Sequence, residues 1–294
     1  MNVAVVGPSD KPERYSYQAV KLVVLAENTA EGRGMRGEHG LSFWIESGTQ
    51  RLLFDTGQGL VLADNAAAMD VDLSSVDAIV LSHGHYDHTG GLAQVLAVAR
   101  RPLPVYAHPG AMAAKYRSSA AGVRAIVLPE TSRQALDTWQ PRLVLSASPA
   151  RIGEGIGTTG EIPRIHPEEV SDERFCLDAG GRVDDPVADD QALMLETAAG
   201  IVLLLGCAHA GLINTLDHVR KLTGGAPLAA VVGGTHLRSA TPGRLDWTIR
   251  ELRRFDIARL YPMHCTGFAA IAALWQELPG RVRVAGAGAA LEID

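Results

Sequence analysis

The chain has 294 residues, of which 47% are hydrophobic and 20% charged, a composition typical of a globular α/β protein and not of a disordered or fibrous one. Its formal net charge of −6 argues against nucleic acid as the main partner, because proteins that bind a phosphate backbone usually carry a basic face. Three scattered cysteines exclude a disulfide framework, and no apolar run has the length of a signal peptide or a membrane span. We therefore expect a cytoplasmic protein without a membrane segment.

Short apolar segments of strand length alternate with Ala- and Leu-rich helical segments along the chain. The expected strands cover residues 21–26, 41–46, 51–55, 78–81, 105–107, 125–128, 143–147, 192–197, 201–206, 229–232, 259–261 and 281–285. The expected helices cover residues 61–69, 92–100, 110–118, 211–222, 242–255 and 269–278. Two hairpins, each followed by strand–helix units, predict two sheets with helices outside them.

Residues 148–190 differ from the rest of the chain, because they are rich in Gly, Pro, Asp, Glu and Arg and show weak periodicity. Long segments of this kind in compact domains are often functional. We interpret this one as an insertion or a lid over the site, with a surface excursion as the alternative.

Three histidines and an aspartate stand within six residues, at His83, His85, Asp87 and His88. Imidazole nitrogen and carboxylate oxygen are ligands suited to zinc, iron or manganese. An apolar run precedes the cluster and paired glycines follow it, which predicts a strand that ends in a tight turn. This spacing is hard to explain by packing alone, so it indicates a metal-dependent enzyme.

Four more polar residues stand directly after expected strands: Asp55, His209, His236 and His264. Loops that follow strands in sheet-based enzymes meet at one edge, where ligands bind. We expect these four side chains to lie near the histidine cluster.

The motif His83-x-His85-x-Asp87-His88, with residues 54–57 upstream and His209 and His264 downstream, resembles the metallo-β-lactamase superfamily. Residues 38–42, 159–164, 206–211 and 234–237 resemble one branch more narrowly. That branch includes dihydropterin ribofuranosylaminobenzene phosphate synthases and many metal-dependent hydrolases of unassigned substrate. The resemblance implies one α/β domain over residues 1–294, folded as a four-layer αββα sandwich with metal bound at one edge between the sheets.

The resemblance also implies two sets of metal ligands. His83, His85 and His209 would hold one divalent ion, and Asp87, His88 and His264 the other, while Asp55 would orient a ligand. We expect two zinc ions, with manganese or iron as alternatives.

The chain departs from the usual superfamily pattern in the second set. Residues 189–191 read Asp-Asp-Gln without a histidine, and no aspartate stands at the bridging place, where the chain has Cys207. Cys207 and Cys265 are expected to pack rather than to bind metal.

These features favour a hydrolase that uses a metal-activated hydroxide on a small anionic ester, lactone or phosphoester. Asp87 would bind metal and orient a proton, and His236 would contact the substrate or act as a structural residue of its loop. The alternatives are a pterin-diphosphate-using synthase of the methanopterin-pathway type and, less favoured, a di-iron redox protein. The expected partner is a small molecule, without nucleic acid or membrane, and the oligomeric state stays open. The basic residues that could bind an anionic substrate are Arg33, Arg36, Lys115, Arg117 and Arg164. The aromatic residues that could stack on it are Trp44, Tyr86 and Tyr116.

Overall fold

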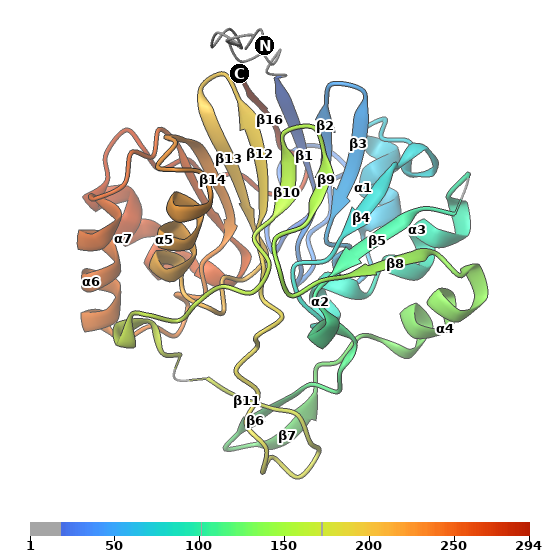
Figure 1. Ribbon diagram of the computed structural model, residues 1–294, viewed down its shortest axis with the longest axis horizontal. Helices are drawn as coiled ribbons and strands as arrows, with labels where there is room; N and C mark the ends of the chain where they lie inside the picture. Colours follow the sequence, from blue (N-terminus) through green and yellow to red (C-terminus); the bar gives the residue numbers. More distant parts are fainter. Residues whose placement is uncertain (1–18, 101, 172) are drawn as a thin grey trace, which may run out of the picture.

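The structure, a computed structural model, describes residues 19–294 except residues 101 and 172. Two sheets face each other in the centre of the molecule, and helices cover their outer faces (Figure 1). A third, three-stranded sheet projects beyond one end of this sandwich (Figure 1). The layers confirm the predicted four-layer αββα architecture of a single domain.

The first sheet has seven strands and the second has six. In spatial order, the first contains β16 (Ala290–Ile293), β1 (Val20–Ala26), β2 (Ser42–Ser47), β3 (Gln50–Phe54), β4 (Ala78–Val80), β5 (Pro104–Ala107) and β8 (Arg142–Leu145). The second contains β15 (Leu260–Met263), β14 (Leu228–Gly234), β13 (Gly200–Leu205), β12 (Leu193–Thr197), β10 (Ile156–Thr158) and β9 (Arg151–Gly153). The third contains β11 (Arg174–Cys176), β6 (Tyr116–Ser119) and β7 (Gly122–Ala125).

Helices pack on the outer face of each large sheet (Figure 1). The first sheet is covered by α1 (Leu62–Ala68), α3 (Leu92–Val98) and α4 (Glu130–Trp139), and the second by α5 (Leu212–Leu222), α6 (Pro242–Leu252) and α7 (Phe268–Glu277). Shorter elements are α2 (Tyr86–Thr89) and the 3-10 helices η1 (Leu73–Ser75), η2 (Pro109–Met112), η3 (Pro167–Glu169) and η4 (His264–Thr266). Among the described helices, none combines the length and the apolar character needed to cross a membrane.

Strand β13 shows why the central strands are apolar along their whole length. Val202 and Leu204 point into the core between the two sheets, whereas Ile201, Leu203 and Leu205 pack against the outer helices. Successive side chains of a strand point to opposite faces, and here both faces are covered. A continuous apolar run is therefore required.

Parallel pairing brings the functional strand ends to one edge. β3 pairs in parallel with β4, and β13 with β14 and β14 with β15. The loops that follow β3, β4, β13, β14 and β15 therefore lie at the end of the sandwich that faces the small sheet (Figure 1).

Three predicted elements are wrong. The first is the strand expected over residues 125–128, which overlaps the observed β7 (Gly122–Ala125) at Ala125 alone. The helix expected over residues 110–118 is replaced by η2 and β6, because Lys115 is drawn into a buried ion cluster and the chain then pairs with β7. The strand expected over residues 281–285 is reduced to a single bridge between Leu260 and Val282, and the strand at the edge of the first sheet is β16.

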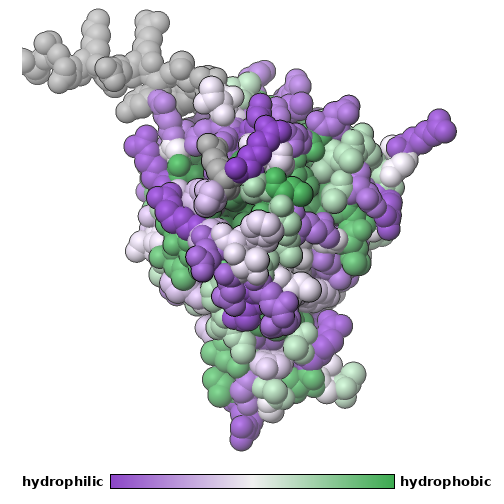
Figure 2. Space-filling model, turned by 90° about the vertical axis from the view of Figure 1, so that its right-hand side faces the viewer, coloured by the Kyte–Doolittle hydropathy of each residue, from purple (hydrophilic) through white to green (hydrophobic). Residues whose placement is uncertain are grey.

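The segment over residues 148–190 is more regular than its composition predicts. Its first part forms β9 and β10, which extend the second sheet. Its later part forms β11, which joins β6 and β7 in the small sheet at the end of the sandwich. Figure 2 shows this end as a narrow lobe in which hydrophilic and hydrophobic side chains alternate.

Candidate metal centre

His83 and His85 lie in the loop between β4 and α2, and Asp87 and His88 lie on α2 itself. This segment packs tightly against neighbouring backbone. A Cβ atom at Gly84 would lie 2.2 Å from the carbonyl oxygen of Ala111, and one at Gly91 would lie 2.3 Å from that of Thr56. The Gly84 amide donates to Asp189 Oδ2 at 2.8 Å. Glycine at these positions lets the segment approach the backbone of Ala111 and Thr56 closely.

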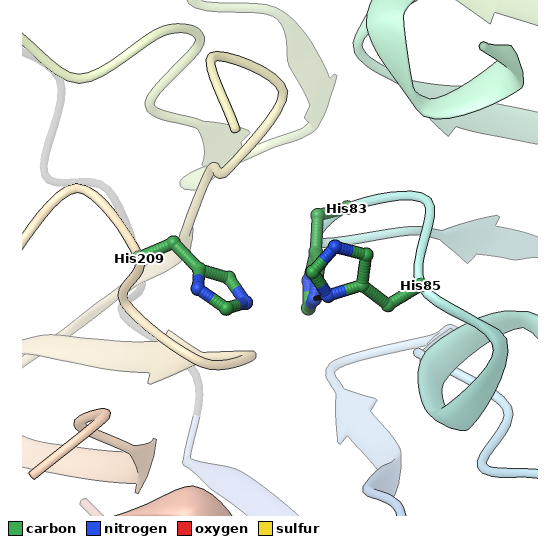
Figure 3. Close-up of side chains that lie close together, drawn as sticks. All are labelled: His83, His85 and His209. Carbon is green, nitrogen blue, oxygen red and sulfur yellow. Dashed lines mark hydrogen bonds between the residues drawn. The ribbon is translucent and has the colours of Figure 1, made fainter. Parts of the chain in front are cut away.

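His83, His85 and His209 point toward one another, His83 and His85 from this loop and His209 from the opposite sheet (Figure 3). One ring nitrogen from each lies within 4.8 Å of the others. The buried His85 Nε2 and both ring nitrogens of His209 have no hydrogen-bond partner among the described residues. Burial lowers the pKa of His85 to about 3 and the pKa values of His83 and His209 well below their usual range, so all three rings are neutral. Neutral imidazoles with converging lone pairs are a donor set that fits a divalent metal ion.

A second set of donors surrounds Asp87. Its Oδ2 lies 3.1 Å from His39 Nε2, 3.5 Å from His264 Nε2 and 4.0 Å from His88 Nε2. His264 Nδ1 lies 2.8 Å from Asn28 Oδ1, which leaves His264 Nε2 buried and without a hydrogen-bond partner among the described residues. Burial opposes ionisation of Asp87, but His88, His264 and His39 hold its pKa well below the usual range. A carboxylate with imidazoles on several sides is a second donor set suited to a cation.

Asp55 lies behind the donors and holds His88. It accepts hydrogen bonds from the Ser82 amide and the Ser82 hydroxyl, each at 2.7 Å, and its Oδ2 lies 2.7 Å from His88 Nδ1. Burial disfavours the imidazolium, but Asp55 and Asp87 outweigh it and raise the pKa of His88 to about 9. This contact at Nδ1 fixes the ring and leaves Nε2 directed at the site, which is the usual relation of a metal-binding histidine to a supporting carboxylate.

Cys207 and Cys265 are brought into the same cluster. Cys207 Sγ lies 3.2 Å from His88 Nε2, and one atom each of Cys207, His264 and Cys265 lie within 4.8 Å of one another. Burial raises the pKa of the Cys207 thiol, so a neighbouring cation is needed to make it a thiolate. The position that lacks the expected bridging aspartate therefore offers a sulfur donor instead.

His236 faces the same cavity from the end of β14. Its Nε2 lies 3.4 Å from Glu173 Oε2, an ion-pair distance, and its amide donates to Cys265 Sγ at 3.3 Å. Burial disfavours the imidazolium, but Cys265 and Glu173 outweigh it and raise the pKa of His236 to about 9. His236 is therefore a cationic side chain at the wall of the site.

The cavity above these donors has a volume of about 170 Å³. Its floor includes His85, His209 and His264, and its walls include Phe175 and His236. Several residues that line it have no role predicted from the sequence: His39, Arg124, Ile126, Glu173, Phe175 and Arg238. Of these, His39 lies in residues 38–42, and Glu173 and Phe175 lie in residues 148–190, the segment predicted to be an insertion or a lid over the site.

The residues predicted to bind the anion or stack on the substrate mostly lie elsewhere. Arg117 and Tyr86 line the cavity, whereas Trp44 is buried in the core and Tyr116 does not line the cavity. Arg33 is exposed, Arg36 pairs with Asp64, Lys115 lies buried between Asp185 and Asp189, and Arg164 donates to the carbonyl oxygen of His209.

Backbone strain is concentrated at this site. Seven non-glycine residues in the described part of the chain have positive φ, and four of them, Asp55, Ala208, His236 and His264, stand at or beside the donors. Such conformations cost about 1–3 kcal/mol each and persist where the surrounding structure enforces them, often at functional sites.

Three comparisons with known proteins agree with this geometry. The sequence profile of the metallo-beta-lactamase superfamily matches residues 35–264. The chain is 32% identical over 263 residues to the 7,8-dihydropterin-6-methyl-4-(beta-D-ribofuranosyl)-aminobenzene-5'-phosphate synthase of Methanocaldococcus jannaschii, covering 85% of this chain and 89% of that protein. It is 35% identical over 255 residues to an uncharacterized protein of the same organism, covering 87% and 94%.

Among solved structures, Tm1679, a metal-dependent hydrolase of the beta-lactamase superfamily, matches with a TM-score of 0.80 and 26% identity, covering 94% of this chain and 99% of that one. The profile spans most of the chain, and the curated relatives match along nearly their whole length. On these grounds the chain belongs to the metallo-β-lactamase superfamily.

Proposed function

We propose that this protein is a metal-dependent hydrolase of a small anionic ester, lactone or phosphoester. The observation that carries the proposal is the convergence of His83, His85 and His209 beside a cavity that His85 and His209 line. The buried His85 Nε2 and both ring nitrogens of His209 lack partners among the described residues. A buried polar group without a partner is costly, and a metal ion would satisfy all three rings at once.

The ligand assignment follows the two donor sets. His83, His85 and His209 would hold one ion, and Asp87, His88 and His264 the other, with Cys207 beside the second. Nitrogen, oxygen and sulfur donors together suit zinc. A divalent ion at such a site acidifies bound water and polarises the bond to be broken.

The remaining residues prepare the site for hydrolysis. Asp55 fixes the ring of His88, and Asp87 offers a carboxylate oxygen that can accept a proton as well as bind metal. The charged His236 can stabilise negative charge on the substrate or donate a proton from its ring to the leaving group. Phe175 and the buried walls limit the access of bulk water.

A synthase that acts on a pterin diphosphate is the second candidate. The 32% identity to the M. jannaschii synthase favours it. The cavity of about 170 Å³ favours the hydrolase, because pockets that enclose a drug-sized ligand usually measure about 300–1,000 Å³. Incubation with a pterin diphosphate and a ribofuranosylaminobenzene phosphate separates the two, since only the synthase releases diphosphate in proportion to a condensed product.

Elemental analysis of the protein purified without added metal tests the proposal. We expect about two equivalents of zinc per chain, and hydrolysis of esters, lactones or phosphoesters that a chelator abolishes and zinc restores. His83→Ala should lose metal and hydrolysis while its circular dichroism stays unchanged. His218→Ala is the matched control, because His218 lies on α5, forms a hydrogen bond with the Thr159 carbonyl oxygen and does not line the cavity. Full metal content in His83→Ala would overturn the assignment.

A further inference from the structure

Two arginines stand directly opposite each other on the small sheet that overhangs the cavity. Arg117 of β6 and Arg124 of β7 are cross-strand partners in the antiparallel pair, and both line the cavity. Like charges in directly opposed positions destabilise a hairpin. An anion bound beside Arg117 and Arg124 would therefore offset the repulsion between them.

The described residues supply only part of that compensation. Glu173 Oε1 lies 2.9 Å from Arg117 Nη2, but Arg124 has no ion-pair partner within the described part of the chain. The second oxygen of Glu173 is engaged with His236 at 3.4 Å. One carboxylate is thus shared between two cationic side chains, and Arg124 is left uncompensated.

A third arginine completes the rim from the other side of the cavity. Arg238 follows β14, and its guanidinium donates to the carbonyl oxygen of His264 at 3.1 Å. Arg238 has no ion-pair partner among the residues that the structure describes, and it lines the same cavity. The rim is therefore locally cationic, although the whole chain has a net charge of −6.

We propose that Arg117, Arg124 and Arg238 bind an anionic group of the substrate, a carboxylate or a phosphate monoester, that is remote from the bond that is broken. The guanidinium fork matches the oxygens of both groups and can bind them in a bidentate manner. That the bound anion belongs to a substrate whose bond is broken rests on the proposed function. Binding of an anion by the three arginines does not.

The side chains between the arginines and the histidines indicate the chemistry of the rest of the substrate. Ile126 and Phe175 line the cavity between the arginines and the histidines, and they are only 5% and 8% exposed. The substrate then has an anionic end at the small sheet, a short apolar middle, and the scissile bond at the metal donors. Phe175 also packs against His85, with ring centroids 5.3 Å apart, so the apolar wall reaches the floor.

Anion binding is measured first by calorimetry on the chelator-treated protein, so that no metal competes for the probe. Inorganic phosphate and glutarate are the two probes, and they distinguish a phosphate site from a carboxylate site. The double variant Arg117→Gln/Arg124→Gln should bind the preferred probe about tenfold more weakly, since two charge-assisted contacts at an exposed rim are lost. Arg124→Lys should recover only part of the affinity, because lysine lacks the fork.

Arg151→Gln is the matched control, since Arg151 lies on β9, does not line the cavity, and is exposed. Binding of both probes that is equal in wild type, the double variant and the control would overturn the anion site. Weaker binding in the double variant alone would support it.

The zinc-loaded enzyme then separates this inference from the proposed function. p-Nitrophenyl hydrogen glutarate and p-nitrophenyl pentanoate differ in the terminal carboxylate, and wild type should prefer the first by about tenfold in kcat/KM. The double variant should lose this preference, measured as the ratio of kcat/KM for the two esters. Hydrolysis without any preference would refute the anion site alone. Arginine-dependent probe binding without hydrolysis of any ester, lactone or phosphoester would refute the proposed function and leave the anion site standing.

Discussion

The buried lysine at the base of the small sheet offers the sharpest test of how the site is held in place. Lys115 Nζ lies 2.9 Å from Asp185 Oδ2 and 2.7 Å from Asp189 Oδ1, and Asp189 Oδ2 in turn accepts the amide of Gly84 in the histidine loop. Lys115→Met leaves both carboxylates without their cation. Removing one partner of a buried ion cluster costs about 3–5 kcal/mol, so we expect that loss in the free energy of unfolding.

Two features of the structure explain the size of this effect. The three side chains are only 2%, 5% and 1% exposed, so solvent screens the charges little. At an effective dielectric constant of 20, each contact is a gross attraction of about 6 kcal/mol, most of which offsets the desolvation of the charges. Lys115→Met loses both attractions and recovers only the desolvation cost of the ammonium, because the two carboxylates stay buried without their cation.

The pH dependence has a defined sign. Burial disfavours the ammonium, but Asp189 and Asp185 outweigh it and raise the pKa of Lys115 above its usual range. The stabilisation is therefore fully present below the unfolded pKa of lysine and is lost only as the pH rises through the raised value. The difference between wild type and variant should stay constant from pH 6 to pH 9.

Urea unfolding of the chelator-treated proteins, followed by circular dichroism, measures this difference. Lys221→Met is the control, since Lys221 is exposed on α5 and its loss should change stability by no more than about 0.5 kcal/mol. Lys115→Met/Asp185→Asn should recover part of the loss, because one of the two uncompensated charges is removed. A loss below about 1 kcal/mol in Lys115→Met would refute the reasoning.

Three further variants test the donor sets. Cys207→Ser should lower the zinc content from about two equivalents to about one, because its thiol lies 3.2 Å from His88 Nε2; unchanged zinc would show that the thiol only packs. Asp55→Asn should weaken metal binding about 10–100-fold in competition with a chelating dye, since His88 loses its supporting carboxylate, and equal affinity would contradict that role. Gly84→Ala should destabilise the fold by about 1–3 kcal/mol in urea, because the new Cβ would lie 2.2 Å from Ala111 O; wild-type stability would mean that the loop can yield.

Much of the candidate centre could be predicted because its residues follow apolar strands directly. Asp55, His209, His236 and His264 each come after a buried strand, and parallel pairing carries those strand ends to one edge. The apolar runs also predict the sandwich, since strands covered on both faces must be apolar throughout. Local sequence therefore contains the information that places these residues.

The small sheet could not be predicted for the opposite reason. Its strands have three or four residues and mix polar with apolar side chains, and β11 follows β6, its partner, by more than 50 residues. Neither alternation nor an apolar run marks such strands. Glu173, Phe175 and Arg124 reach the cavity only through this pairing, so their roles were not visible in the sequence.

The donors come from both halves of the sandwich, and this division has a thermodynamic consequence. His83 and His85 follow β4 of the first sheet, whereas His209 follows β13 of the second. An ion that these three residues share would join the two sheets, and it would satisfy ring nitrogens that are otherwise buried without partners. Binding would then stabilise the folded state by an amount that grows with the concentration of free metal relative to its Kd. Ala208 and His264 have strained backbone conformations with positive φ, which packing of the sheets enforces when no metal is bound. The same ion would help to stabilise these conformations.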